Sequence, residues 1–288
     1  YTTKIEKDVV ISTWQSIYKM PRKYFEQFGC VIGDEAHMFK AKSLTGIMTK
    51  LHQCKYRFGL TGTLDGSQTH KLVLEGLFGT VEKVVSTKEL IDKNTLAKLK
   101  IKCIVLKHPS IRERMDYAEE IDYLVSKETR NKFILDLCKT ISGNTLCLFQ
   151  LVEKHGKILY DGMKGGENVY FVYGGTDTEQ REKIRGLVEG HTKSTTIASY
   201  GTFSTGINIR NINNIVLASP SKSKIRVLQS IGRGLRTSST KDSILIFDIA
   251  DDISYGERRN FTLNHFFERI NIYNEEQFNY EISKVKIK

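Results

Sequence analysis

Short apolar runs and stretches of helical spacing alternate through the first 83 residues. Three runs rich in β-branched or aromatic residues begin near Val9, Phe28 and Arg57, and each has the length of a buried strand. Helical spacing separates them, as in residues 40–53. Because strands and helices alternate, we predict a parallel sheet with helices on its faces.

The same alternation resumes further along and predicts a second parallel α/β domain over residues 100–253. Its expected strands lie at 100–106, 145–149, 169–173, 195–199, 214–218 and 243–248. Its expected helices lie at 112–142, with a break near Ser126, at 152–163, after Asp177 and at 223–235. Residues 200–208 are rich in glycine and hydroxyl side chains and are predicted to form a loop.

Two further segments complete the expected organisation, in which the first domain covers residues 1–83. Residues 84–99 contain few large apolar side chains and are predicted to link the two domains. Residues 254–288 form a C-terminal extension, with a helix over 257–272 and the alternating pattern of an edge strand over 278–287. The predicted fold class is therefore α/β, with two parallel-sheet domains.

Composition narrows the class of protein. Apolar residues make up 40% of the 288 residues, and no apolar stretch approaches the ~20 residues needed to span a bilayer. The five cysteines include no Cys-x-x-Cys pair, and most lie in apolar runs, where a thiol packs as a small hydrophobe. We expect a reduced, intracellular protein without structural zinc and without a membrane partner.

The net charge of +11 favours a polyanionic partner such as nucleic acid. The alternative is a soluble protein with a lysine-rich surface, which the charge alone does not exclude. The positions of particular polar residues have to decide between the two.

The first such position is the end of the 28–33 strand. Asp34 and Glu35 follow the apolar run directly, and His37 comes two residues later. At the carboxyl end of a strand, α/β enzymes place carboxylates that hold a metal ion or act as a general base. The alternative is an acidic pair that merely faces solvent.

The second position is the helix predicted over 223–235, which carries Gln229, Arg233 and Arg236. Two arginines three residues apart on a helix point the same way and can clamp phosphate oxygens. The alternative is a solvated basic helix. Gly232 and Gly234 count against it, because each glycine in a surface helix costs about 1 kcal/mol, and they suggest that something approaches the backbone closely.

Hydroxyl and amide side chains supply weaker candidates for phosphate contacts. These side chains follow predicted strands in three places: Ser12, Thr13 and Gln15, then Thr61 and Thr63, then Thr202, Ser204, Thr205 and Asn208, the last group together with the glycine Gly206. For the first group a helix cap is an equally good interpretation, and the two roles are compatible.

Taken together, these stretches resemble the superfamily 2 helicases and DNA translocases. Asp34-Glu35-Ala36-His37 matches the DEAH box, and Leu60-Thr61-Gly62-Thr63 looks like the third motif. Gly206-Ile207-Asn208 is similar to the fifth motif, with Asn where Asp is commoner, and Gln229-x-x-Gly232-Arg233-x-x-Arg236 matches the sixth. The resemblance implies two RecA-like motor domains, the first incomplete.

The resemblance also implies roles. Asp34 would hold Mg²⁺ on the phosphates of ATP, Glu35 would activate the attacking water, and His37 would couple the nucleotide site to motion. Arg233 and Arg236 would be arginine fingers, with Gln229 nearby. Gly206 and Asn208 would face the nucleotide, while Thr61, Thr63, Thr202, Ser204 and Thr205 would sense nucleotide and grip DNA, and Ser12, Thr13 and Gln15 would contact the DNA backbone.

The implied partners are double-stranded or branched DNA, including forks, Holliday junctions and R-loops with their RNA–DNA hybrids. Relatives of this kind serve recombination, replication and repair. The implied state is a monomer in the cytoplasm, for phage members that of an infected bacterium.

A motor of this kind also needs a phosphate-binding loop of the form G-x-x-x-x-G-K-[ST]. Residues 190–194 contain Lys-Ser, but Thr192 stands where the glycine belongs. The chain also begins without Met, so we expect it to be the C-terminal part of a helicase, inactive alone. A non-catalytic nucleic-acid-binding or annealing module and the motor subunit of a restriction enzyme remain alternatives.

Overall fold

The computed structural model describes residues 8–39, 41–62, 64, 68–109, 115–206, 209–220, 223–235, 241–254 and 258–288. Contacts divide the chain into two compact units, Tyr1–Val84 and Val85–Lys288. Within the described ranges, no helix is long and apolar enough to cross a membrane.

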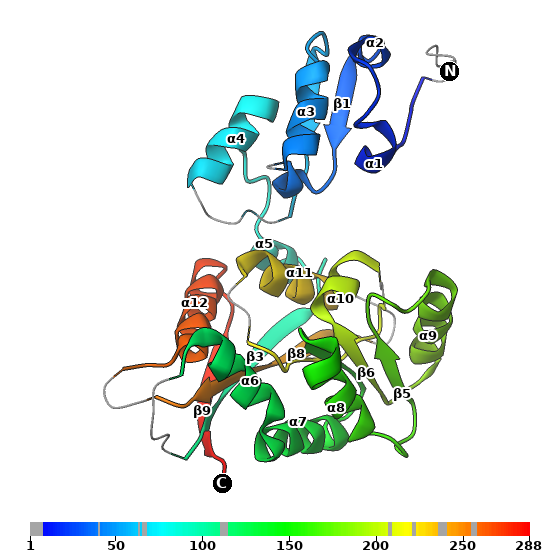
Figure 1. Ribbon diagram of the computed structural model, residues 1–288. Helices are drawn as coiled ribbons and strands as arrows, with labels where there is room; N and C mark the ends of the chain where they lie inside the picture. Colours follow the sequence, from blue (N-terminus) through cyan, green and yellow to red (C-terminus); the bar gives the residue numbers. More distant parts are fainter. Residues whose placement is uncertain are drawn as a thin grey trace. The chain divides into compact units, whose positions relative to one another are not determined.

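The first unit contains a parallel pair of strands with helices around it (Figure 1). Its strands are β1 (Cys30–Gly33) and β2 (Tyr56–Gly59), with Ile32 opposite Phe58. Its helices are α1 (Trp14–Ile17), α2 (Arg22–Phe25), η1 (Ala36–Met38), α3 (Lys42–Lys50) and α4 (Gln68–Phe78). The predicted alternation from residue 22 onward is confirmed.

The two faces of this small sheet differ. On one face, Gly33 and Gly59 leave room for the rings of Phe39 and Phe78, whose centroids lie 5.1 Å apart. On the other face, Ile32 and Phe58 are 64% and 52% exposed. Parallel sheets are normally covered on both faces, so the second face is an uncovered apolar surface.

The strand predicted to begin at Val9 is wrong in this structure. Val9 and Ile11 are 75% and 95% exposed, and residues 9–13 have no regular structure before α1 begins at Trp14. A strand requires a hydrogen-bonded neighbour, and this segment pairs with neither β1 nor β2. Its β-branched composition alone does not place it in the sheet.

The second unit is a seven-stranded, fully parallel sheet in the order β5-β6-β4-β7-β8-β3-β9. The strands are β3 (Lys98–Lys107), β4 (Asn144–Phe149), β5 (Val169–Val172), β6 (Ser194–Ser199), β7 (Asn214–Leu217), β8 (Ser243–Asp252) and β9 (Tyr280–Lys286). Each of the strands predicted between 100 and 248 is present.

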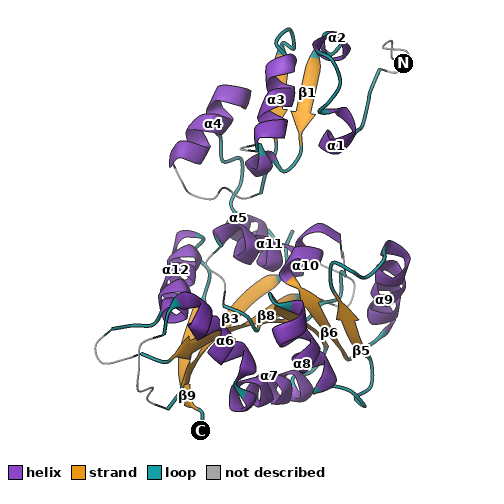
Figure 2. Ribbon diagram, viewed as in Figure 1, coloured by secondary structure: helices purple, strands orange, loops and turns teal. Residues whose placement is uncertain are grey.

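Helices cover both faces of this sheet (Figure 2). They are α5 (Thr87–Asp92), α6 (Tyr117–Ser126), α7 (Glu128–Thr140), η2 (Val152–Gly156), α8 (Lys157–Asp161), α9 (Thr178–Gly190), α10 (Tyr200–Gly206), α11 (Lys224–Gly234) and α12 (Phe261–Glu275). One apolar core lies under α9 to α12, and a second lies under α7 and α8. The break predicted near Ser126 separates α6 from α7.

Residues predicted as a linker and as an extension belong to this second unit. Residues 87–92 form α5, and β3 begins at Lys98. At the other end, β9 pairs in parallel with β3 at the edge of the sheet, as its alternating pattern predicts. Phe278 is 7% exposed in the core, and Arg269 of α12 forms a buried ion pair with Asp248 of β8.

Candidate functional site

The Asp34–His37 segment turns sharply after β1. Glu35 has left-handed backbone angles, φ 50° and ψ 48°, which a residue with a side chain adopts only when its surroundings hold it there. Asp34 Oδ1 accepts a hydrogen bond from Glu35 N at 2.9 Å, and Ala36 N donates to Leu60 O at 2.8 Å. The turn directs both carboxylates into solvent while His37 is buried.

His37 connects this turn to the end of β2. Its Nδ1 lies 3.0 Å from Thr61 Oγ1 and 3.3 Å from Glu35 Oε2. The contact follows from the topology, because the carboxyl ends of adjacent parallel strands meet at one edge of the sheet. The sequence motifs placed His37 and Thr61 in one site without indicating that they bond directly.

The carboxylates fit a weakly held Mg²⁺ better than a dedicated metal cage. Among the described residues, no three His, Cys, Asp or Glu side chains gather as a metal site. Mg²⁺ is typically bound by one or two carboxylates together with substrate phosphates and water. Asp34, exposed at the end of β1, meets that requirement.

In the second unit, α11 carries the predicted arginine motif. Gln229 is half-buried, and Ser230 and Ile231 are buried. Arg233 lies within the helix, but its side chain, like the whole of Arg236, is outside the described part of the chain.

The two glycines of this helix differ. A Cβ on Gly234 would overlap Ile244 Cδ1 and lie 2.8 Å from Ile215 Cδ1, whereas a Cβ on Gly232 would meet nothing within 4 Å. Close approach is therefore real at Gly234, but the approaching groups are core side chains of β7 and β8. The predicted close approach to the backbone is therefore confirmed for Gly234 and wrong for Gly232.

The predicted Gly-rich loop over 200–208 is instead helical through Gly206. Thr202 is 4% exposed, and its Oγ1 lies 2.8 Å from Ser199 Oγ. Its hydroxyl is thus used inside the fold, and the predicted DNA contact by Thr202 is wrong in this structure. The remaining predicted positions here lie outside the described side chains, namely Ser204, Thr205 and Asn208, as does Thr63 in the first unit.

Ser12, Thr13 and Gln15 are all exposed. Thr13 precedes the first residue of α1, and its Oγ1 lies 3.0 Å from Ser16 Oγ. The helix-cap position is therefore observed, although Thr13 makes no side-chain bond to the helix backbone. The three side chains remain accessible to a polar partner.

A buried polar network in the second unit escaped the sequence analysis. Asp251 of β8 accepts from Arg130 Nε at 2.8 Å and contacts His108 Nε2 at 2.9 Å. Burial would raise the pKa of Asp251, but Arg130 and His108 lower it to about 2. Burial, reinforced by Arg130, lowers the pKa of His155 to about 3. The available signal was the pair of aspartates, Asp248 and Asp251, within the largely apolar strand β8.

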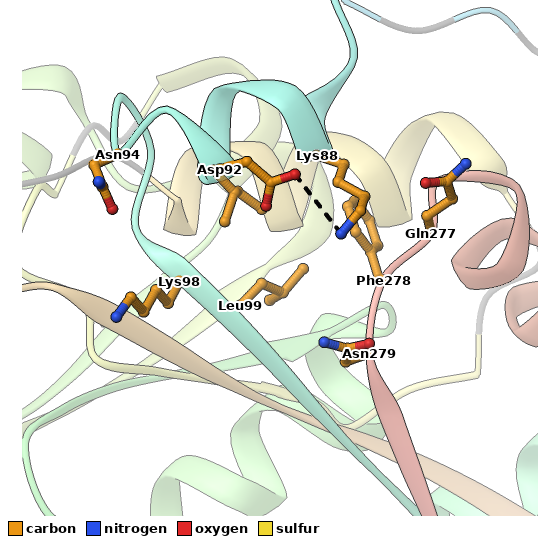
Figure 3. Close-up of a pocket in the computed structure, with 9 residues that line it drawn as sticks. Lys88, Asp92, Asn94, Lys98, Leu99, Gln277, Phe278 and Asn279 are labelled. Atoms are coloured by element: carbon orange, nitrogen blue, oxygen red, sulfur yellow. Dashed lines mark ion pairs between the residues drawn. The ribbon is translucent and has the colours of Figure 1, made fainter.

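A cavity of about 460 Å³ in the second unit has no predicted site residue among its described lining residues (Figure 3). It lies between α5, the start of β3 and the turn before β9, and Phe278 and Leu99 contribute apolar surface. Lys88 and Asp92 on its rim form an ion pair at 3.8 Å. The cavity therefore belongs to the packing of α5 rather than to the motif residues.

Two sequence families match the chain. The family described as "Helicase conserved C-terminal domain" matches residues 118–238, in the second unit. The family described as "Type III restriction enzyme, res subunit" matches residues 2–66, in the first unit. The two matches lie in the same order as the two units.

The ATP-dependent DNA helicase UvsW of Enterobacteria phage T4 is similar along almost the whole chain. The two are 34% identical over 302 residues, which cover 99% of this chain and 60% of the phage protein. This chain thus spans less than two thirds of that relative. The crystal structure of T4 UvsW matches with a TM-score of 0.57 at 33% identity, over 95% of this chain and 57% of that one.

A fragment structure of a putative HsdR subunit of a type I restriction enzyme from Vibrio vulnificus YJ016 shares the fold. Its TM-score is 0.69 at 16% identity, over 94% of this chain and 50% of that one. Residues 118–238 thus carry a helicase C-terminal domain, and the parallel α/β fold of the chain matches that of RecA-like helicase domains.

Proposed function

We propose that this chain is part of an ATP-driven helicase or translocase that acts on branched, double-stranded DNA in recombination, replication and repair. The observation that carries the proposal is the Asp34–His37 turn, which presents two exposed carboxylates and bonds through His37 to Thr61. Similarity to an ATP-dependent DNA helicase supports the DNA substrate.

Asp34 and Glu35 would have different roles in ATP hydrolysis. When bound, Mg²⁺ would neutralise charge on the phosphates of ATP, and Asp34 would hold it. The carboxylate of Glu35, 54% exposed and 3.3 Å from His37 Nδ1, would orient the attacking water and accept its proton. The left-handed backbone at Glu35 fixes the direction of that side chain in advance.

The His37–Thr61 bond gives this turn a means of reporting the state of the nucleotide. A shift of Glu35 would move His37, and His37 would move the segment after β2 through Thr61. We propose that Thr61 transmits this movement to the DNA-binding surface, to which the exposed Ser12, Thr13 and Gln15 contribute. Arg233 and Arg236 would supply the positive charge that stabilises the transferring phosphoryl group, with the uncharged amide of Gln229 nearby.

The phosphates of ATP would be held by a G-x-x-x-x-G-K-[ST] loop from outside these 288 residues. The bare face of β1 and β2, with Ile32 and Phe58, supports this proposal because additional strands and helices could cover it. We therefore expect no DNA-stimulated ATP hydrolysis from the 288-residue chain alone, and robust turnover by it would contradict that part of the proposal.

The test of the function is ATP hydrolysis by the protein that includes such a loop, measured with linear, forked and four-way DNA. We expect stimulation by DNA, strongest with the branched forms. Glu35→Gln should lower kcat by about 10³-fold while nucleotide binding persists, because it keeps the shape and removes the base. Arg233→Ala should also abolish hydrolysis, with DNA binding largely intact.

The same experiment distinguishes the alternatives. DNA binding without hydrolysis would favour a non-catalytic annealing module, which the absence of a phosphate loop from this sequence already suggests. Equal stimulation by linear and branched DNA would favour a duplex translocase of the restriction-enzyme type, in keeping with the family match over residues 2–66. Whether the protein is a branched-DNA helicase or a duplex translocase, its affinity for DNA should fall steeply as the salt concentration rises, because phosphate contacts release counterions.

A further inference from the structure

Buried side chains hold Ala218 and Ser219, which lie between β7 and α11 in the sequence. Ala218, at the end of β7, accepts a hydrogen bond from Arg130 Nη2 at 2.7 Å. Arg130 is 0% exposed and is oriented by its ion pair with Asp251. The buried guanidinium thus ties α7, β8 and the residue after β7 together.

The next residue, Ser219, is held from three further directions. Its Oγ accepts from Gln150 N at 3.1 Å and lies 2.9 Å from His155 Nδ1. Its carbonyl oxygen accepts from Tyr200 Oη at 3.0 Å. Because Ser219 is 4% exposed, these bonds are protected from water and fix the backbone at Ser219, five residues before α11 begins.

The other end of α11 is held by Lys241. This side chain is 3% exposed, and its Nζ donates to the carbonyl oxygen of Gly234, the last residue of the helix. Leu235 O, one residue later, accepts from Ala97 N at 2.8 Å. A cation at a helix C-terminus is favoured by the helix dipole, and here it also satisfies a carbonyl that the helix leaves unpaired.

Neither Arg130 nor Lys241 belongs to the motifs that indicate the function. We propose that both are positioning residues for the arginine-bearing helix, because they hold the backbone on either side of Gln229 and Arg233 against the sheet. The role of this anchoring in ATP hydrolysis rests on the proposed function, whereas the anchoring itself does not. Displacement of catalytic groups by about 1 Å can cost 10²-fold in rate, so holding the backbone at Ser219 and at Gly234 would matter to hydrolysis.

The first test is amide hydrogen exchange over residues 224–235 in the 288-residue chain, with no nucleotide present. Lys241→Met keeps the length and apolar bulk of the side chain and removes the donor, so exchange in the last turn of α11 should quicken by at least about tenfold. Lys241→Arg, which restores a donor, should recover most of the protection.

Lys193→Met is the matched control. Lys193 Nζ also donates to a helix-end carbonyl, that of Lys139 in α7, at 2.9 Å. The control should leave exchange in α11 unchanged. Equal exchange in α11 for Lys241→Met and the wild type would overturn the anchoring.

The second test is ATP hydrolysis by the protein that includes the phosphate-binding loop. Lys241→Met should lower kcat by about 10–100-fold with the KM for ATP within about threefold, because the transition state depends on the arginines more than ground-state binding does. Loss of exchange protection with unchanged kcat would overturn the positioning role. A wild type without hydrolysis would instead overturn the proposed function, and the exchange result would still decide whether Lys241 holds the helix.

Discussion

At the scale of single residues, the candidate site around Glu35 could be predicted from the sequence, but its geometry could not. The motif identifies Asp34, Glu35 and His37 as candidates, and the structure brings them together at one turn. The left-handed backbone at Glu35 and the His37–Thr61 bond were not predictable, because both depend on how β1 and β2 are aligned. The anchoring by Arg130 and Lys241 was equally hidden, since each donates to a backbone carbonyl, of Ala218 and Gly234, that no side-chain pattern identifies.

The two glycines of α11 provide a paired prediction. Gly234→Ala should destabilise the second unit by about 1–3 kcal/mol, because the added methyl group collides with Ile244 and Ile215. Gly232→Ala should stabilise it by about 0.5–1 kcal/mol, because the methyl group meets nothing within 4 Å and alanine favours a helix. Urea unfolding of both variants measures the difference, and equal effects would contradict the packing argument.

Lys241 should also make stability depend on pH. Burial lowers its pKa from 10.5 to about 8, so between these values the unfolded chain binds more protons than the folded one. Stability from this group therefore rises as pH increases through that window. Wild type should gain up to about 2 kcal/mol relative to Lys241→Met between about pH 7.5 and 9.5.

Unfolding free energies of the two proteins at matched pH values check this prediction. Lys193→Met is measured alongside as the control for removal of a lysine that bonds a helix-end carbonyl from an exposed position. A constant difference between wild type and Lys241→Met across the range would mean that the Lys241 ammonium is solvated.

At the scale of elements, periodicity predicted most strands and helices of the second unit. It failed where a local pattern permits two structures. Residues 200–206 form a helix although glycine and hydroxyl residues usually mark a loop, because Tyr200 and Phe203 anchor them in the core. Residues 9–13 have strand composition, but their structure depends on a neighbour that β1 and β2 do not provide.

The C-terminal segment supplies the prediction at this scale. Phe278 is 7% exposed and precedes β9, whereas Ile282 in β9 is 48% exposed. Phe278→Ala should cost about 3–5 kcal/mol of stability, because it opens a cavity in the core that spans β3 and α12. Ile282→Ala should cost less than about 1 kcal/mol. Thermal unfolding measures the stability of both variants. Equal losses of stability would contradict the placement of Phe278 in the core and of Ile282 on the exposed edge strand.

At the scale of the whole molecule, the two units have separate apolar cores. The sequence predicted two parallel α/β domains, because alternation of strand and helix is a long-range pattern that tolerates local errors. It could not predict the strand order of the larger sheet, since parallel strands adjacent in space are distant in sequence.

Separate cores should unfold separately. We expect two transitions in scanning calorimetry of the 288-residue chain. Phe39→Ala should lower only the transition of the first unit, and Phe278→Ala only that of the second, because each ring packs in a different core. A single transition shifted by both variants would show that the units unfold cooperatively.

The pairing of β9 with β3 has a consequence for synthesis on the ribosome. Ile101 lies opposite Tyr280, which is translated about 180 residues later. At bacterial-to-eukaryotic elongation rates of about 5–20 residues per second, one edge of β3 waits roughly 10–35 s for its neighbour. During that interval the nascent strand is open to chaperones and to mispairing, so the yield of folded protein should depend on the speed of translation.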